Sequence, residues 1–307
     1  MQYAKSLVNE HWWDFTCLDQ DLLERAANLS EQEVLRLAND NLRINIYDDL
    51  DEMFLSQAME YISTWKQASV DAPTGICGPV GPTRQMPIVA KLINELNLDL
   101  RHCHFWGMDE WCVDGKTIDP AHLLSFTGAN HRLWIDKIRP ELRIPAEHLH
   151  FPTLDNLDTF SESFNTFDCK VMQGGLGHTL HWAFNEPLAR DSETPMSAEA
   201  YRQLKARTVD LHPISTIQNA TGIAGRYLNG MPTSAVTVGP AETFQCDKVS
   251  IWYPGNNQNP FGLKLALLML SEGIQSSLAP ISVLAEHPNV VFNIYRPSLM
   301  ACDLVIK

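Results

Sequence analysis

The segment Met172–Pro187, which reads MQGGLGHTLHWAFNEP, holds the side chains best suited to catalysis. A glycine-rich turn leads to His181, and Glu186 follows just before a proline. A neutral imidazole can move a proton near pH 7, and a nearby carboxylate fixes its tautomer and raises its basicity. The segment therefore predicts an acid/base site in which Glu186 supports His181. The alternative is a structural histidine that caps the turn.

The same turn offers backbone N–H groups to an anion. Gly175 and Gly177 precede the histidine, and the apolar run Phe167–Met172 before them is typical of a short strand. Open α/β sheets usually display their chemistry where a strand ends in such a turn. We therefore expect both glycines to contact a substrate or its phosphate.

A second pair of candidates, Asp109 and Glu110, follows the strand-like segment Arg101–Met108. Adjacent side chains on an extended chain point in opposite directions. One carboxylate can therefore enter a site while the other braces the loop in which we place the pair. The alternative is an acidic surface turn.

Weaker signals concern phosphate and metal binding. The Gly/Pro-rich loop Ala72–Pro82 could hold a phosphate on its N–H groups, although no GKS or GKT follows it. Arg226 and Lys264 are candidate cations, although a surface position explains each of them better. His178 could join His181 and Glu186 as a metal ligand, but the spacing matches no standard zinc pattern. No metal or cofactor is predicted.

Composition narrows the function classes. The chain has 307 residues and is 45% hydrophobic, so it can bury a full core. Its net charge of -14 argues against a nucleic-acid partner, because phosphate backbones require clustered Lys and Arg. The seven cysteines are scattered without a CxxC pair, which favours reduced thiols and a cytoplasmic location. No apolar run predicts a signal peptide or a membrane partner.

The periodicity of apolar residues predicts strands that alternate with helices, and hence a three-layer α/β fold with a mostly parallel open sheet and helices on both faces. Residues 1–42 are expected to form a helical extension packed on a main domain at residues 43–307. Further expected strands are Arg43–Tyr47, His148–Phe151, Ala235–Val238, Val249–Tyr253 and Val290–Tyr295. Expected helices are Leu50–Gln67, Gln85–Leu96, Leu123–Ile138, Ser197–Thr208 and Gly262–Glu272, with a polar turn at Gly255–Asn259.

From about Arg43 onward, the chain resembles the glucosamine-6-phosphate deaminase/isomerase family, which is related to 6-phosphogluconolactonase. The family's GGVGxDGHIAFNEP motif is matched by Gly174–Pro187, and its NMDEY motif by Gly107–Trp111. Looser matches are Ala72–Gly75 to the GLPTGGTP loop, Arg143–Leu149 to DIPAENI, and His122–Ile138 to a helix. The FNEP ending and the MDE motif favour the deaminase branch.

The resemblance implies roles for these residues. Asp109 would move a proton between the first two carbons of an open-chain sugar, and His181 would open the ring with support from Glu186. Glu110 would support the loop. Residues that would bind the substrate or its phosphate are Thr74, Gly75, Gly175, Gly177, Arg226 and Lys264. The substrate would be a phosphorylated sugar, and a homo-oligomer is implied by resemblance alone.

Three departures from the family pattern bear on which sugar phosphate the substrate would be. Thr179 and Leu180 stand where the family has aspartate and glycine, the phosphate loop is altered, and no lysine follows the glycine turn until Lys264. A threonine cannot supply the charge that would hold a histidinium, so ring opening should be weaker or differently tuned. The sequence predicts a sugar-phosphate isomerase or deaminase. The alternatives are a 6-phosphogluconolactonase-like hydrolase and a non-catalytic sugar-phosphate-binding protein.

Overall fold

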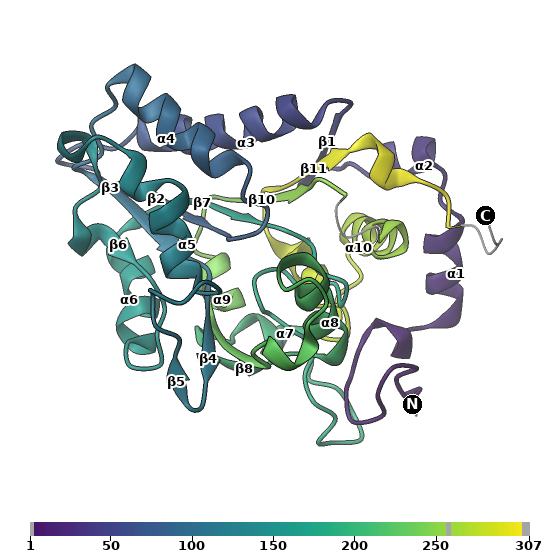
Figure 1. Cartoon of the computed structure of the whole chain (residues 1–307). Helices are drawn as coiled ribbons and strands as arrows, with labels where there is room; N and C mark the ends of the chain where they lie inside the picture. Colours follow the sequence, from purple (N-terminus) through teal and green to yellow (C-terminus); the bar gives the residue numbers. More distant parts are fainter. Residues whose placement is uncertain (1–2, 256–258, 303–307) are drawn as a thin grey trace.

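The computed structural model describes residues 3–255 and 259–302, which form an α/β structure with two sheets (Figure 1). In the larger, seven-stranded sheet every neighbouring pair is parallel, in the order β1-β11-β10-β7-β2-β3-β6. Its strands are β1 (Leu42–Tyr47), β2 (Thr74–Gly78), β3 (Cys103–Gly107), β6 (Leu149–His150), β7 (Asp168–Gly174), β10 (Lys248–Tyr253) and β11 (Val290–Tyr295).

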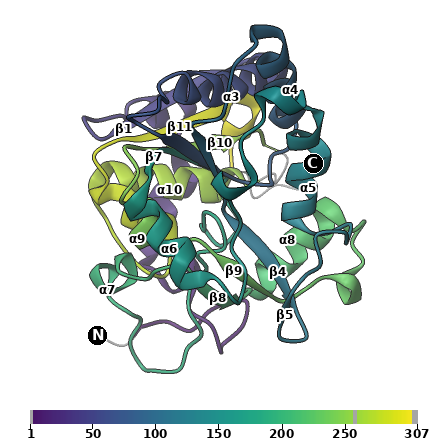
Figure 2. The same ribbon diagram turned by 90° about the vertical axis from the view of Figure 1, so that its left-hand side faces the viewer.

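The smaller sheet is antiparallel, in the order β5-β4-β9-β8. Its strands are β4 (Asp109–Val113), β5 (Lys116–Thr117), β8 (Arg207–Asp210) and β9 (Ser234–Thr237). It lies below the large sheet in Figure 2, next to α5 and α8. Trp111, Phe126, Phe184 and Ala235 belong to the apolar cluster that joins this sheet to α5 and the site loop.

The α-helices of the described residues are α1 (Gln20–Asn28), α2 (Glu31–Leu35), α3 (Leu50–Trp65), α4 (Gln85–Leu96), α5 (Phe126–Leu133), α6 (Leu157–Thr166), α7 (Ala198–Arg202), α8 (Pro213–Ile223), α9 (Pro240–Thr243) and α10 (Pro260–Glu272). Short 3-10 helices are η1 (Phe15–Cys17), η2 (Ile135–Lys137), η3 (Pro140–Leu142), η4 (Ala146–His148), η5 (Leu228–Gly230), η6 (Pro280–Glu286) and η7 (Arg296–Leu299).

Helices cover both faces of the large sheet, with α3 and α4 on one side and α6 and α10 on the other (Figure 1). Alternation along the strands produces the two cores. In β3, Phe105 packs toward α3 and α4, whereas its neighbour Trp106 packs toward α6. In β7, Val171 and Met172 divide in the same way. A sheet buried on both faces explains why these strands are apolar at successive positions.

The strand order reverses between β2 and β7, and this reversal fixes where a site can form. From β2 the chain adds β3 and β6 on one side, then returns to place β7 on the other side of β2. The loops that leave the carboxyl ends of β2 and β7 therefore diverge and leave a crevice between them. Ligands of open α/β sheets bind in such a crevice.

The N-terminal extension covers a mostly apolar helix that is buried on every side. In α10 the residues from Gly262 to Leu270 are buried, and its neighbours include α1, α2 and η6. A helix of this kind requires cover on every side, and α1 packs its own buried Leu22 and Ala26 into the same core. The division into an extension and a main domain stays a prediction.

Most of the predicted elements are confirmed, including β1, α3, α4, β7, β9, β10, α10 and β11. Four were wrong in part. The expected loop Ala72–Pro82 contains the buried strand β2. The expected helix Ser197–Thr208 ends at Arg202, and β8 begins at Arg207. Asp109 and Glu110 open strand β4 and do not lie in a loop. Leu123–Ile138 divides into α5 and η2, and part of Gly255–Asn259 lies outside the described residues.

Three histidines stack at the β3–β6 edge of the large sheet. His104 is buried, its Nδ1 lies 3.0 Å from Nε2 of His150, and its ring centroid is 4.2 Å from that of His148. Burial, with the neighbouring imidazoles, lowers the pKa of His104 to about 3 and that of His150 to about 4. Both side chains are therefore neutral in the folded protein at pH values where an unfolded histidine binds a proton.

We predict that this stack makes the fold sensitive to acid. Because the folded pKa values lie below the ordinary value of about 6.5, its contribution to stability is complete above that pH and is lost as pH falls toward 4. His150→Phe should flatten this loss in thermal unfolding measured from pH 7 to pH 4. His122→Gln, at an exposed position, is the control for the loss of one imidazole. An unchanged slope in His150→Phe would contradict the prediction.

Candidate active site

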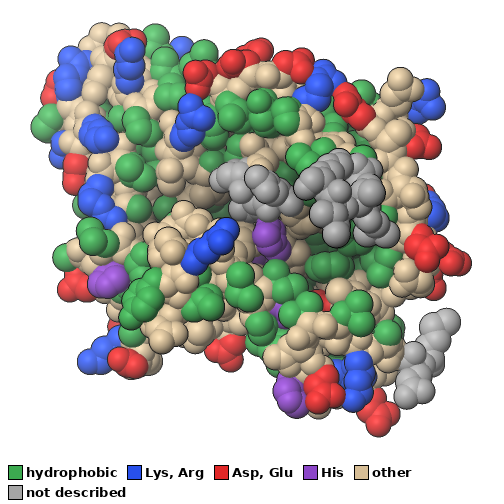
Figure 3. Space-filling view, turned by 45° about the vertical axis from the view of Figure 1, so that its right-hand side comes forward, with side chains coloured by type: hydrophobic (Ala, Val, Ile, Leu, Met, Phe, Trp, Pro, Cys, Tyr) green, Lys and Arg blue, Asp and Glu red, His purple; other side chains and the backbone are tan. Residues whose placement is uncertain are grey.

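A cavity of about 680 Å³ lies at the carboxyl ends of β2, β7 and β10. Its walls come from the loop after β2, the turn after β7, the start of β4, and helices α5 and α8. Residues that line the cavity include Gly81, Thr83, Arg84, Asp109, Gly175, Gly177, His181, Phe184, Gln218 and Asn219. Figure 3 shows a hollowed face in which green hydrophobic side chains and a purple histidine lie close together.

Asp109 is held at the cavity wall by two donors. Its Oδ1 accepts hydrogen bonds from the Phe184 N–H at 3.0 Å and from Thr237 Oγ1 at 2.5 Å. Thr237 stands directly opposite Asp109 in the β4–β9 ladder, so sheet register places this donor. Burial nevertheless raises the pKa of Asp109 to about 7, outweighing the two hydrogen bonds and the nearby His181. The carboxyl group therefore titrates where a general base must work.

Glu110 points away from the cavity and holds the start of α5. It is buried and accepts hydrogen bonds from Ser125 Oγ and from the N–H groups of Phe126 and Thr127 at 2.8–3.0 Å. A carboxylate at a helix N-terminus satisfies free N–H groups and complements the helix dipole. The opposite directions of Asp109 and Glu110 follow from the pleat of β4.

His181 lies in a buried group of polar side chains. Its Nδ1 is 2.7 Å from Thr179 Oγ1, 3.2 Å from Ser215 Oγ and 3.4 Å from Glu186 Oε2. Thr179 Oγ1 also donates to Glu186 Oε2 at 2.7 Å. Burial pushes the pKa of Glu186 upward, but His181 and the hydroxyls of Ser215 and Thr179 outweigh it and lower the pKa overall. Glu186 is therefore ionised.

These contacts determine the tautomer of His181. A threonine hydroxyl has one proton, and Thr179 gives it to the carboxylate of Glu186, which can only accept. The same oxygen can therefore only accept a hydrogen bond from His181, so Nδ1 must carry the ring proton. Whenever the ring is neutral, Nε2 is therefore the nitrogen without a proton. Thr179 thus transmits the orienting effect of Glu186 to the imidazole.

The glycine turn is shaped around this imidazole. A Cβ atom on Gly177 would lie 2.1 Å from the His181 ring, and one on Gly175 would lie 3.3 Å from the Gly81 carbonyl oxygen. Leu180 adopts φ 62°, a left-handed conformation that favours glycine, and its buried side chain holds it there. Gly177 therefore provides room for the catalytic candidate, and both glycines line the cavity.

Among the described residues that line the cavity, Arg84 is the one lysine or arginine. It follows the loop Pro79–Thr83 and is the N-cap residue of α4. Its guanidinium lies 2.7 Å from Asp51 Oδ1 and 4.8 Å from the centroid of the Phe54 ring. The side chains of Arg84 and Asp51 are both exposed, so the ion pair between them is weak and can be exchanged for another anion. A loop that leads into a helix N-terminus beside an arginine is suited to an anion.

Four expected binding residues do not line the cavity. Thr74 and Gly75 lie inside β2, where Thr74 Oγ1 donates to the Asp168 carbonyl and a Cβ on Gly75 would overlap the His104 backbone. Lys264 is buried one turn into α10. Arg226 is exposed beyond the end of α8, at φ 71°. Thr74 and Gly75 lie away from the cavity because the segment matched to the phosphate loop still forms β2.

Sequence reasoning also missed three residues of the site. Arg84 had a usable signal, because it is the first cation after the Gly/Pro segment and directly precedes a helix. Thr237 and Ser215 had no local signal, since their roles arise from the pairing of β4 with β9 and from the approach of α8 to His181.

Within the described residues, no cluster of three or more His, Cys, Asp or Glu side chains fits a metal ion. Nor is any described helix long and apolar enough to cross a membrane.

The fold and the crevice define an open α/β protein with its candidate site at the β2–β7 reversal. No protein-family model matches the chain. A monomeric glucosamine-6-phosphate deaminase of the NagB superfamily superimposes with a TM-score of 0.66 at 18% identity, over 84% of this chain and all of its own (100%). The resemblance in fold expected from the sequence is thereby confirmed.

Lactonases share the same fold. The 6-phosphogluconolactonase of Trypanosoma brucei aligns with a TM-score of 0.55 at 14% identity, covering 85% of this chain and 98% of its own. The 6-phosphogluconolactonase of Thermotoga maritima gives 0.54 at 12% identity, with 83% and 100% covered. At these identities the likeness establishes the fold, which this chain shares with enzymes of both activities.

We predict that Gly177→Ala displaces the His181 imidazole. The added methyl group meets the ring at a distance that atoms do not occupy, so either the ring or the turn must move. Overpacking of this kind typically costs about 1–3 kcal/mol. The free energy of unfolding and the His181 imidazole NMR signals should both change. Gly222→Ala is the matched control, because its added Cβ meets nothing within 4 Å. Unchanged His181 signals in Gly177→Ala would contradict the prediction.

Proposed function

We propose that the protein is an enzyme that opens the ring of a phosphorylated sugar and moves a proton between its first two carbons. The substrate class is an amino-sugar phosphate or a related hexose phosphate. One observation carries the proposal: Asp109, a base with a pKa of about 7, lines one cavity together with His181, and Arg84 lies on the same wall.

Ring opening is assigned to His181. Nε2 takes the proton of the anomeric hydroxyl, and the same nitrogen then returns a proton to the ring oxygen as the bond from that oxygen to the anomeric carbon breaks. During this step the ring is transiently an imidazolium. Glu186 stabilises the positive charge through the Thr179 hydroxyl and directly, because its Oε2 lies 3.4 Å from His181 Nδ1.

Proton transfer is assigned to Asp109. Its carboxylate takes the proton from carbon two of the open-chain aldose, which gives an enediolate. The hydroxyl at carbon two then passes its proton, by way of His181 Nε2, to the oxygen of carbon one, while Asp109 returns its proton to carbon one to form the ketose. The carboxyl group is supported at Oδ1 by Phe184 and Thr237, which leaves Oδ2 for the substrate. An aldose–ketose isomerisation balances with these two residues alone.

The test is a panel of amino and non-amino sugar phosphates, each assayed for isomerisation, ammonia release and deuterium exchange at carbon two, together with a sugar-phosphate lactone assayed for hydrolysis. Exchange at carbon two supports the Asp109 base. Lactone hydrolysis without any exchange would instead assign the site to a hydrolase in which His181 activates water. Ligand-induced thermal stabilisation without turnover or exchange would indicate a binding protein.

Asp109→Asn should abolish turnover and keep ligand binding. Asparagine Oδ1 can accept the same hydrogen bonds from Phe184 and Thr237, so the geometry is retained and only the base is lost. Calorimetric binding and a coupled turnover assay measure the two effects. Asp114→Asn, in the exposed turn after β4, is the control. Full activity in Asp109→Asn would reject the assigned base.

The raised pKa of Asp109 predicts two opposite pH effects. Because the base must be ionised, kcat/KM should fall as pH drops below about 7. Stability should move the other way: a raised folded pKa favours the folded state at low pH, and this contribution is lost as pH rises through about 7. Asp109→Asn should therefore have a Tm at pH 8 at least equal to that of the wild type. A clear decrease in Tm would contradict this.

Arg84→Met should weaken binding of phosphorylated substrates. Loss of one charge-assisted contact to a phosphate costs about 1.5–3 kcal/mol, or roughly ten- to a hundredfold in KM. The value of kcat should change little, because Arg84 is assigned to binding alone. Arg101→Met is the control, since Arg101 forms an exposed pair with Asp99. Equal KM values for Arg84→Met and the wild type would remove Arg84 from the phosphate site.

A further inference from the structure

The N-terminal segment, residues 4–16, reaches the back of the candidate site. It clamps the chain just after Glu186: the Trp13 N–H donates to the Leu188 carbonyl at 3.0 Å, and the Arg190 N–H donates to the His11 carbonyl at 2.8 Å. Trp12 and Ala189 form an antiparallel bridge. The segment therefore holds one side of the His181 group through the backbone.

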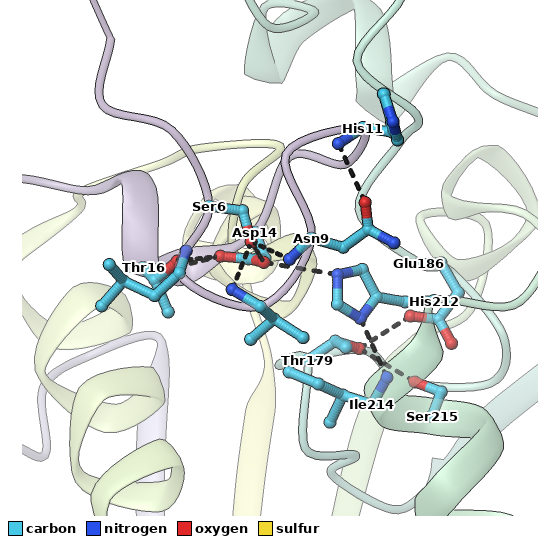
Figure 4. Close-up of polar contacts among 12 residues, drawn as sticks. Ser6, Asn9, His11, Asp14, Thr16, Thr179, Glu186, His212, Ile214 and Ser215 are labelled. Carbon is cyan, nitrogen blue, oxygen red and sulfur yellow. Dashed lines mark hydrogen bonds and ion pairs between the residues drawn. The ribbon is translucent and has the colours of Figure 1, made fainter.

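Asp14 of this segment is completely buried. Its Oδ1 accepts hydrogen bonds from the N–H of Thr16 at 2.9 Å and from the Thr16 hydroxyl, and its Oδ2 accepts from Ser6 Oγ. The same Oδ2 lies 3.3 Å from Nε2 of His212 (Figure 4). Burial opposes ionisation, but the contacts with His212, Ser6 and Thr16 lower the pKa of Asp14 overall. A buried carboxylate thus faces a buried imidazole.

His212 connects Asp14 to α8. It is the N-cap residue of that helix, and its Nδ1 accepts a hydrogen bond from the Ile214 N–H at 3.2 Å. Since Nδ1 is the acceptor, the neutral ring carries its proton on Nε2, which faces Asp14. The edge of the ring packs against Trp12, with 5.1 Å between centroids. Asp14 therefore selects the tautomer that can cap α8.

The first turn of α8 carries Ser215, which is completely buried and lies 3.2 Å from His181 Nδ1 and 3.4 Å from Thr179 Oγ1. Close contacts thus lead from Asp14 to His212 and through the start of α8 to Ser215 (Figure 4), which lies beside His181. The polar groups at both ends are buried, so displacing one leaves another unsatisfied.

We propose that Asp14 and His212 are positioning residues, through which the N-terminal segment sets the orientation and tautomer of His181. The catalytic part of this inference rests on the proposed function; the structural part does not. Asp14 acts because it accepts at both oxygens. An asparagine there must turn its NH₂ group either to the Thr16 N–H or to the His212 Nε2–H, and both are donors. If His212 then changes tautomer, it loses its bond to Ile214.

The experiment compares Asp14→Asn with the wild type by two measurements. Long-range ¹⁵N NMR of the imidazoles, with His181 assigned from His181→Asn, reports its tautomer and pKa without any substrate. We expect a displaced His181 resonance and a changed pKa. For an identified substrate, we expect kcat to fall about tenfold with KM little changed, because misplacing an acid/base group affects the reacting step.

His212→Asn is the second variant, because asparagine is a good N-cap residue and leaves the α8 start satisfied while breaking the link to Asp14. It should displace His181 in the same direction, and adding Asp14→Asn to it should have no further effect. Asp19→Asn, at the N-cap of α1, is the control for a lost carboxylate in the extension. It should leave His181 unchanged.

Three outcomes separate the ideas. Folded variants with an unchanged His181 resonance and unchanged kcat would overturn the inference, as would additive effects of the two substitutions. If Asp14→Asn does not fold, His212→Asn alone decides by the same resonance. If the wild type turns over no sugar phosphate, the proposed function fails, while the NMR comparison still tests the positioning pair.

Discussion

The site depends on one buried contact, the 2.7 Å approach of His181 Nδ1 to Thr179 Oγ1. That hydroxyl has a single proton, which it donates in a hydrogen bond to the ionised Glu186. The direction of the contact is therefore fixed, and with it the ring nitrogen that carries the proton when the ring is neutral. A carboxylate buried here without its donors would be costly, so the turn after β7 and the start of α8 must both be in place.

Two carboxyl groups of the site have opposite environments. The pKa of Asp109 is raised by burial to about 7, whereas that of Glu186 is lowered because His181 and two hydroxyls outweigh its burial. Groups whose pKa values are moved apart in this way can take different parts in acid/base chemistry. The two pKa values differ because the carboxyl groups lie on different elements: Asp109 is in β4, and Glu186 is in the loop after β7.

The N-terminal extension belongs to both the core and the site. Its helix α1 covers the apolar α10, and residues 4–16 reach the segment after Glu186 and the start of α8. Neither role has a signature in the first forty-two residues alone. Asp14 in particular has the appearance of an ordinary helix-capping acid, and it does cap η1. Its contact with His212 joins residues that are far apart in the sequence.

The sequence by itself determined the α/β class and the main strands and helices, because apolar periodicity reflects burial that is local to each element. It also predicted His181, Glu186 and Asp109 as candidate site residues, whose types and neighbours are visible along the chain. Only the tertiary structure decided that Thr74 and Gly75 lie within a buried strand, that Arg84 lines the cavity, and that Thr237, Ser215 and His212 support the acid/base groups. These roles depend on strand order, sheet register and helix approach. Such long-range relations leave no mark on the spacing of neighbouring residues.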